Sequence, residues 1–312
     1  GLRVWSAALT LCELFGRGLL PQAQQPTGTV IELGALWAAG LSFFDALCHS
    51  LTNVSTGGFS TQGGSIGAFG SSLVEWIVIL FMVLGGINFV LHYRVLTGRA
   101  KSLLMDRELR YFLSVIFLAT AAICGVAWYG LQTEASPPIF RDVLFTVVSL
   151  LTGTGYATAD FELWSPFAHV VLLGLMILGG MAGSTSGGVK SLRVVLILDS
   201  VRSYFAAAGH RRAVRQPVQH SGKPVSEDVM ASLWAFLAVY FALAACMALV
   251  VALAGYDLET SISGALTAVS NVGPALGAIG PYDHFYHFPA LVKLCFAFCM
   301  IAGRLELFTL LV

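Results

Sequence analysis

Residues 146–158 read TVVSLLTGTGYAT and carry the main structural signal of the sequence. An apolar run that begins near residue 139 leads into the alternating threonines and glycines of 152–156, and polar residues follow. A membrane-spanning helix needs roughly 20 apolar residues, whereas runs of about 10–14 are typical of segments that enter a membrane and turn back. The run 139–151 is therefore predicted to descend partway as a short helix, and the glycine stretch to return as an irregular turn.

Composition predicts that the chain lies in a lipid bilayer. Of its 312 residues, 57% are hydrophobic and only 11% are charged, whereas about 25% are charged in a typical soluble domain. The net charge is zero and no basic–aromatic pattern is present, so no nucleic-acid partner is expected. The six cysteines lie in apolar surroundings without a CxxC pair, which is typical of small buried side chains rather than a disulfide or zinc framework.

Longer apolar runs alternate with the short ones. Four of them are long enough to span a bilayer, namely 73–97, 109–131, 228–254 and 287–312. A fifth, 166–200, is interrupted by GGMAGSTSGG at 179–188, and residues 29–41 are typical of the end of a further spanning helix. The stretch 12–30 is irregular, because its two prolines and three glutamines are expected to break a helix.

The short runs repeat. Three of them each lie between two long runs and lead to a glycine: 42–54, 139–151 and 259–272. When the chain is superposed on Gly58, Gly155 and Gly273, a hydroxyl residue falls three positions before each glycine. The chain is therefore predicted to contain three copies of one unit, in the order long helix, short helix, glycine turn, long helix.

Charge predicts the orientation of these units. Lysine and arginine gather in the loop 98–110 and in the segment 202–223, whereas the glycine-turn side carries mostly aspartate and glutamate. Loops rich in lysine and arginine face the cytoplasm. The basic loops are therefore predicted to be cytoplasmic, and the short helices and glycine turns to open outward.

The glycine turns are the predicted functional elements. Unpaired backbone is tolerated at membrane depth only where protein buries it or where it lines a watery cavity, so the three turns are expected to face one another around a pore. Rings of backbone carbonyls replace the hydration shell of potassium in TVGYG filters, and TGTGY at 152–156 is close to that pattern. The alternative is a packing site of small residues between helices.

The motifs together resemble one family of transporters. The stretches that carry the resemblance are FFDALCHSLTNVSTGGFST (43–61), TGTGYAT (152–158), GGMAGSTSGGVKSLRV (179–194), SNVGPALG (270–277) and AGRLELFTLLV (302–312). They resemble the Trk/Ktr/HKT superfamily of potassium transporters, and within it the bacterial Trk membrane subunits of the Trk-H/Trk-G type.

This resemblance implies an all-α membrane protein with four such units around one pseudo-fourfold potassium pore. Residues 1–97, 98–200 and 227–312 then correspond to the second, third and fourth units, the last truncated, and 201–226 is a basic cytoplasmic connection. The first unit is expected upstream of Gly1. The resemblance also implies a homodimer in the cell inner membrane and a cytoplasmic nucleotide-binding regulatory subunit of the Trk-A type. NAD or ATP would belong to that subunit, and this chain is expected to bind no cofactor.

The resemblance assigns the potassium filter to three matched groups of residues. These are Thr56, Gly57, Gly58, Gly153, Thr154, Gly155, Asn271, Val272 and Gly273. The third copy has Pro274 where the others have Phe59 and Tyr156, so the ring is expected to be only approximately fourfold. Such a filter is also compatible with sodium.

A gate is expected below the filter. Its residues are Gly183, Ser184, Thr185, Ser186, Gly187, Gly188, Lys190 and Arg304. The run 183–188 consists of poor helix formers, and broken helices at membrane depth mark ion sites in transporters; a tight helix seam is the alternative. An arginine deep in a membrane needs an interior partner, so Arg304 is predicted to meet the carbonyls of this run. Alternatively, Arg304 and Lys190 extend to the membrane edge.

The predicted function is potassium uptake by an ion-conducting subunit, driven by the membrane potential, without enzymatic chemistry. A sodium-permeable or cation- or proton-coupled transporter of the same architecture is the alternative, and a small-solute transporter with a midplane site is a weaker one. An intramembrane enzyme is disfavoured because the sequence offers no catalytic pair. Lys190 comes one residue too late for a phosphate-binding loop.

Overall fold

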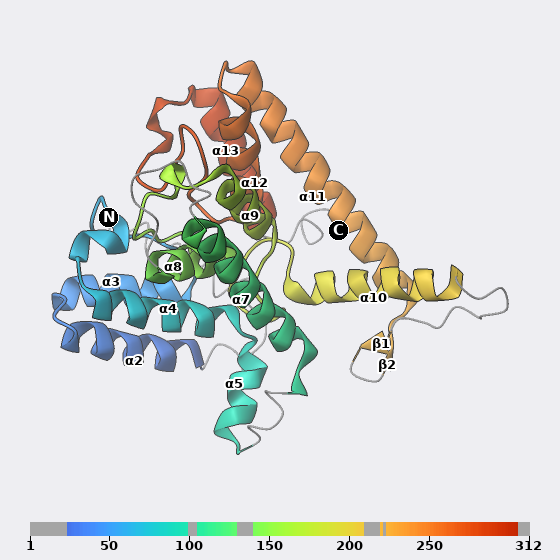
Figure 1. Cartoon of the computed structure of the whole chain (residues 1–312), viewed down its shortest axis with the longest axis horizontal. Helices are drawn as coiled ribbons and strands as arrows, with labels where there is room; N and C mark the ends of the chain where they lie inside the picture. Colours follow the sequence, from blue (N-terminus) through green and yellow to red (C-terminus); the bar gives the residue numbers. More distant parts are fainter. Residues whose placement is uncertain (1–23, 99–104, 130–139, 209–218, 221–222, 305–312) are drawn as a thin grey trace.

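The computed structural model describes residues 24–98, 105–129, 140–208, 219–220 and 223–304 (Figure 1). These residues are helical or irregular, apart from one antiparallel pair of two-residue strands, β1 (Gln219–His220) and β2 (Lys223–Pro224). The end of the predicted run 287–312 and the first part of the irregular stretch 12–30 lie outside them.

Nine of the described helices fall into three consecutive groups of three, which are called here the first, second and third copies of the predicted unit. The first copy consists of α2 (Gln24–Ala38), α3 (Phe43–Val54) and α4 (Ser72–Gly86), the second of α7 (Arg107–Trp128), α8 (Phe140–Thr152) and α9 (Pro166–Ile177), and the third of α11 (Glu227–Leu253), α12 (Leu258–Ser270) and α13 (Ala290–Arg304). In each copy the second helix is short and ends at one of the predicted glycine turns. Two further helices, α5 (Phe89–Leu96) and α10 (Ser191–Ala208), connect the copies, and the loops contain the short 3-10 turns η1 (Ser65–Phe69), η2 (Phe161–Leu163) and η3 (Phe285–His287).

Polar caps fix where many of these helices begin. A side-chain oxygen accepts a hydrogen bond from a backbone N–H in the first turn, which satisfies a donor that the helix itself leaves unpaired. The capping residues are Ser42 for α3, Asp106 for α7, Ser165 for α9, Ser226 for α11 and Asp257 for α12. The expectation that Pro26 breaks a helix is wrong, because α2 begins at Gln24 and Pro26 falls in its first turn, where the N–H that proline lacks has no intrahelical partner.

Within the described residues, two helices, α7 and α11, are long and apolar enough to cross a membrane, and the pair α4 and α5 would make a third span despite a bend of 103° between them. The expectation that 73–97 forms one spanning helix is therefore wrong in its geometry. The helix breaks after Gly86, whose carbonyl oxygen accepts from Met181 N (2.9 Å), and Asn88 then caps α5 through Val90 N (2.8 Å).

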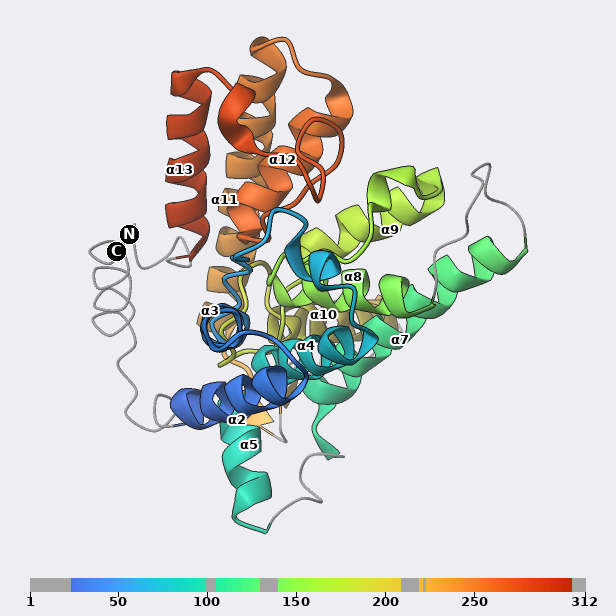
Figure 2. The same ribbon diagram turned by 90° about the vertical axis from the view of Figure 1, so that its left-hand side faces the viewer.

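The buried apolar residues form two clusters. One packs the first and second copies together around residues such as Met82, Phe112 and Leu172, and the other belongs to the third copy around Tyr240, Val269 and Phe296. Figure 2 shows α11, α12 and α13 grouped above the helices of the first two copies. The glycine turns lie where these two groups meet.

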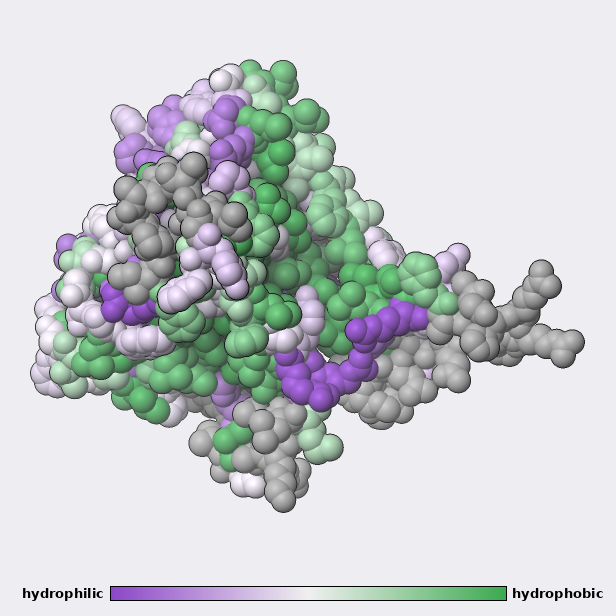
Figure 3. All heavy atoms as spheres, in the orientation of Figure 1, coloured by the Kyte–Doolittle hydropathy of each residue, from purple (hydrophilic) through white to green (hydrophobic). Residues whose placement is uncertain are grey.

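The outer surface is apolar over much of the helical body. Exposed large apolar side chains follow α11 along its length, including Val229, Trp234, Phe241, Leu249 and Leu253. Figure 3 shows this apolar surface, with hydrophilic residues gathered at the top of the view and around the lower end of α7 and α10. Such a surface is typical of a protein whose helical body is surrounded by lipid.

Candidate functional site

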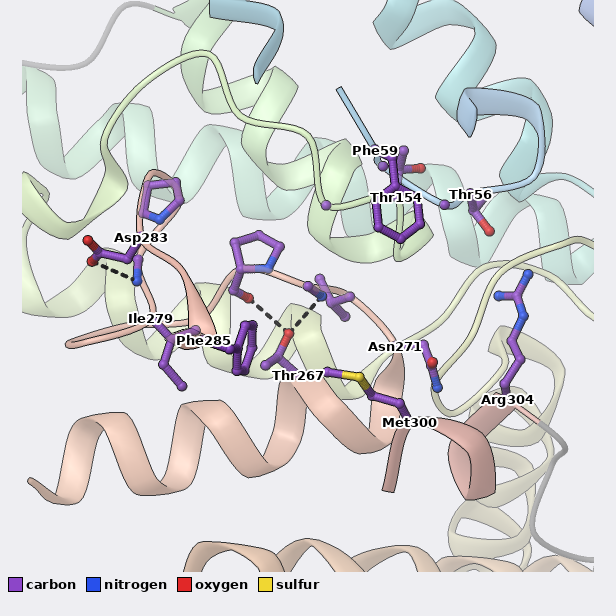
Figure 4. A pocket seen from close by; sticks show the side chains of 18 of the residues that line it. Thr56, Phe59, Thr154, Thr267, Asn271, Ile279, Asp283, Phe285, Met300 and Arg304 are labelled. Carbon is purple, nitrogen blue, oxygen red and sulfur yellow. Dashed lines mark hydrogen bonds between the residues drawn. The ribbon is translucent and has the colours of Figure 1, made fainter. Parts of the chain in front are cut away.

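The three glycine turns meet at one cavity of about 590 Å³. It is lined by all the predicted filter residues except Gly153, and also by Arg304, Met300 and Asp283. Figure 4 shows Thr154 beside Thr56 and Phe59, with Asn271, Met300 and Arg304 grouped at one end and Asp283 at the other. Segments that are far apart in the sequence therefore bring their glycines to a shared space.

Two of the glycines touch the neighbouring copy directly. A Cβ added to Gly58 would overlap the carbonyl oxygen of Thr154, and one added to Gly155 would overlap the carbonyl oxygen of Val272. Both glycines have positive φ, +64° and +79°, a conformation that side chains disfavour. Gly273 also has positive φ, +110°, but no described atom outside its chain neighbours lies within 4 Å of its added Cβ. The ring of turns is thus closed on two flanks and open on the third.

One hydroxyl residue anchors each turn in the same way. It lies six positions before the glycine, within the short helix, and its side chain donates to the carbonyl oxygen of the residue after the glycine. These bonds are Thr52 Oγ1 to Phe59 O (3.0 Å), Ser149 Oγ to Tyr156 O (2.7 Å) and Thr267 Oγ1 to Pro274 O (2.9 Å). The anchor is therefore a feature that the three copies share.

The turn N–H groups also point back to these anchors. Gly57 N (2.7 Å) bonds to the backbone oxygen of Thr52, Thr154 N (3.0 Å) to that of Ser149, and Val272 N (3.0 Å) to that of Thr267. Since the N–H groups are used inside each copy, the carbonyl groups of the turns remain as the acceptors that can face the cavity.

These anchors are not among the residues predicted from the sequence. Thr52, Ser149 and Thr267 superpose in the alignment that matched the glycines, so the signal was present as a second shared hydroxyl position. A serine or threonine inside a helix commonly bonds back to its own helix. A hydrogen bond from such a hydroxyl to the carbonyl of a following turn is therefore not expected from the sequence alone.

An irregular loop, residues 178–190, separates α9 from α10. Its two ends lie side by side, because Gly179 N donates to Val189 O (2.9 Å) and Val189 N to Ile177 O (3.0 Å). The loop contains the predicted gate residues, with Gly183 (φ +76°) and Gly188 (φ +70°) in the left-handed region. Ser184 bonds within the loop to Met181 O (2.6 Å) and Ser186 Oγ accepts from Gly180 N (2.7 Å).

This loop packs directly against the glycine turns. Thr56 Oγ1 donates to Thr185 O (3.0 Å), and Thr185 Oγ1 donates to Val54 O (3.1 Å) at the end of α3. On the other side, a Cβ added to Gly187 would overlap the carbonyl oxygen of Ser270 at the end of α12. The loop therefore reaches from the first copy to the third.

The two cations predicted for the gate lie in different places. Arg304 lies at the cavity in the last described turn of α13 and donates from Nη2 to Ser55 O (3.3 Å). The carbonyl of Ser55 lies outside the run 183–188 that was predicted to meet Arg304. Lys190 closes the loop, where its carbonyl accepts from Arg193 N (2.9 Å) in α10.

The class of protein follows from this arrangement: a helical membrane protein in which repeated glycine turns line one cavity. Comparison with known proteins agrees. The model of the TrkH family, described as a cation transport protein, matches residues 29–312. The Trk system potassium uptake protein TrkI of Halomonas elongata is 35% identical over 290 residues, covering 91% of this chain and 58% of the relative. TrkG of Escherichia coli is 35% identical over 279 residues, covering 88% and 56%.

A solved structure is similar over the same region. The crystal structure of the potassium transporter TrkH from Vibrio parahaemolyticus superposes with a TM-score of 0.83 and 31% identity, over 91% of this chain and 61% of that one. The chain belongs to the TrkH family, as its motifs predict. It spans about three fifths of the length of the relatives it matches.

Proposed function

We propose that this chain forms most of the wall of a potassium-selective pore in a Trk-type uptake protein. The proposal rests on two contacts between neighbouring copies: Gly58 lies against the carbonyl oxygen of Thr154, and Gly155 lies against the carbonyl oxygen of Val272. The second and third copies each present the carbonyl before their glycine to the glycine of the copy that precedes them. A ring built by that rule surrounds an ion with main-chain oxygens, which can replace its water.

A fourth glycine turn belongs on the open flank of Gly273. By the same rule, the carbonyl of a further unit would face Gly273 as Thr154 faces Gly58. The cavity lies between Ser55–Phe59 of the first copy and the third copy, which is where such a unit would complete the ring. The relatives are long enough to contain it.

The loop 178–190 acts as the gate in this proposal, together with Arg304. Thr185 and Gly187 contact the ends of two short helices, so the loop lies across the path that leads away from the turns. The positive charge of Arg304 at the cavity repels a passing cation until the loop and α13 move.

The remaining features of the proposal concern the whole protein. It is a homodimer in the inner membrane, its basic loops face the cytoplasm, and a nucleotide-binding regulatory subunit docks on them and carries any NAD or ATP. The membrane potential drives potassium inward, at about 2.3 kcal/mol per charge per 100 mV. This chain supplies backbone oxygens and no cofactor.

The proposal is tested by uptake of rubidium, a potassium analogue, into liposomes that contain the full-length protein. Gly155→Ala places a Cβ on the oxygen of Val272, so uptake should fall about 5- to 150-fold, because overpacking typically costs 1–3 kcal/mol. Gly174→Ala in α9 is the matched control, since no described atom crowds that position, and uptake should be unchanged. Full rubidium uptake by Gly155→Ala at unchanged selectivity would refute the filter.

A sodium-permeable pore is the second candidate. Pro274 follows the third glycine where the first two copies have Phe59 and Tyr156, and Tyr156 bonds through its hydroxyl to Thr52 Oγ1 (2.5 Å) in the neighbouring copy. A proline cannot make that bond, so the wall is less braced on this side. The ratio of rubidium to sodium uptake by the unmodified protein separates the two candidates.

A further inference from the structure

Glu108 is a buried carboxylate at the start of α7, with an exposed fraction of 6%. One of its oxygens, Oε1, accepts a hydrogen bond from the backbone N–H of Ala182 at 2.6 Å. The backbone of Leu192, in the first turn of α10, also acts on this carboxylate. A single side chain of the second copy therefore binds the loop 178–190 at Ala182 and lies beside the start of the helix that follows the loop.

Arg107, the residue before Glu108, makes a second link from the first turn of α7. Arg107 Nη2 lies 2.9 Å from Asp199 Oδ1, an ion pair between α7 and α10. The charged groups close enough to act on Glu108 are Lys190, at the end of the loop, and Asp106, the cap of α7. The first turn of α7 is thus joined to the loop and to the helix that follows it.

We propose that Glu108 is a positioning residue that latches the loop 178–190 in the arrangement that obstructs the pore. Hydrogen bonds to a charged acceptor are about twice as strong as neutral ones. A buried carboxylate that loses such donors is strongly disfavoured. The latch therefore has two states, with the loop either bound to Glu108 or released from it, and partly bound arrangements are disfavoured. Glu108 itself belongs to the basic segment 98–110, so a movement of that segment has a direct route to the gate.

The inference rests on the proposed function for its transport consequence, but the latch itself is measurable without transport. In full-length protein, Glu108→Ala should raise the hydrogen–deuterium exchange rate of the amides of 180–192 about tenfold, because the variant removes the charge-assisted bond to Ala182 N. Rubidium uptake should rise with it, and the ratio of rubidium to sodium uptake should stay the same, since the glycine turns are untouched. Glu108→Gln keeps an acceptor oxygen without the charge and should give a smaller rise in both.

Glu227→Ala is the matched control, because Glu227 is also a glutamate in the first turn of a long helix but is exposed. It should change neither exchange of 180–192 nor uptake. Size-exclusion chromatography and a thermal melt establish whether each variant assembles. If Glu108→Ala does not assemble, the exchange and uptake measurements are made on Glu108→Gln.

Unchanged exchange of 180–192 in both Glu108 variants would overturn the latch. Faster exchange with equal or lower uptake would overturn the claim that the latched loop obstructs the pore. If the unmodified protein carries no rubidium, the proposed function fails, while the exchange measurement still decides whether Glu108 holds the loop.

Discussion

The flanks of the glycine ring differ in one respect. Gly58 and Gly155 each press against a backbone oxygen of the next copy, whereas Gly273 has open space on the corresponding side. All three have positive φ, so backbone conformation favours glycine at every copy. A closely approaching neighbour requires glycine only at Gly58 and Gly155. The difference separates what a turn needs by itself from what it needs in order to join a ring.

The largest expected effect comes from placing alanine on both kinds of flank in the full-length protein. Gly58→Ala should reduce rubidium uptake about 5- to 150-fold, because backbone on both sides of the contact would have to move. Gly273→Ala should be equally damaging, because the proposed fourth unit would bring a carbonyl to that side. Rubidium uptake into liposomes measures both variants.

A mild Gly273→Ala variant beside a severe Gly58→Ala variant would show that the third flank stays open, and the fourth unit would then be wrongly placed. The strain of φ +110° alone would cost roughly 1–2 kcal/mol. Gly125→Ala, in uncrowded surroundings in α7, serves as the control for the substitution itself.

The anchors sharpen the same comparison with a smaller effect. The Thr267 hydroxyl donates to Pro274 O and also accepts from Gly273 N (2.9 Å), whereas the Ser149 hydroxyl donates to Tyr156 O. Thr267→Val should therefore destabilise its turn by about 1–3 kcal/mol because it leaves an N–H unpaired, and Ser149→Ala by about 0.5–1.5 kcal/mol. Thermal unfolding and the rubidium-to-sodium ratio are the measurements, and an equal loss in the two variants would contradict the assignment.

The smallest effect concerns the outer side of the closed flank between the second and third copies. There the Glu162 carboxylate packs on Gly280. Burial, then the charges of Asp160, Asp283 and Glu259, raise the pKa of Glu162 to about 7. Because the folded protein holds this proton more tightly than the unfolded chain, stability should fall as pH rises from about 4.5 to about 7 and level off above.

Glu162→Gln should remove that fall. The melting temperature of the variant should exceed that of the unmodified protein more at about pH 8 than at about pH 5. A gain of the same size at both pH values would show that packing, rather than charge, is the cause.

Much of this arrangement follows from sequence patterns. The lengths of apolar runs predict α7 and α11 closely, and the glycine superposition finds turns that do meet in space. The bend between α4 and α5 could not be found in the same way, because its partners are distant: Met181 N binds Gly86 O and Phe89 N binds Gly183 O (3.3 Å). Similarly, Arg304 binds Ser55, which is 249 positions away in the chain, and no local sequence pattern predicts that contact.

The direction of the three short helices has a consequence of its own. Each of α3, α8 and α12 ends at the cavity by its carboxyl end. A helix carries about half a negative elementary charge there, from the aligned dipoles of its peptide groups. Three such ends aimed at one space attract a positive ion and repel chloride, and they add to the charge of Asp283 at the other end of the cavity. In the proposed pore, discrimination by the sign of charge would therefore come largely from the architecture, ahead of any discrimination by ionic radius.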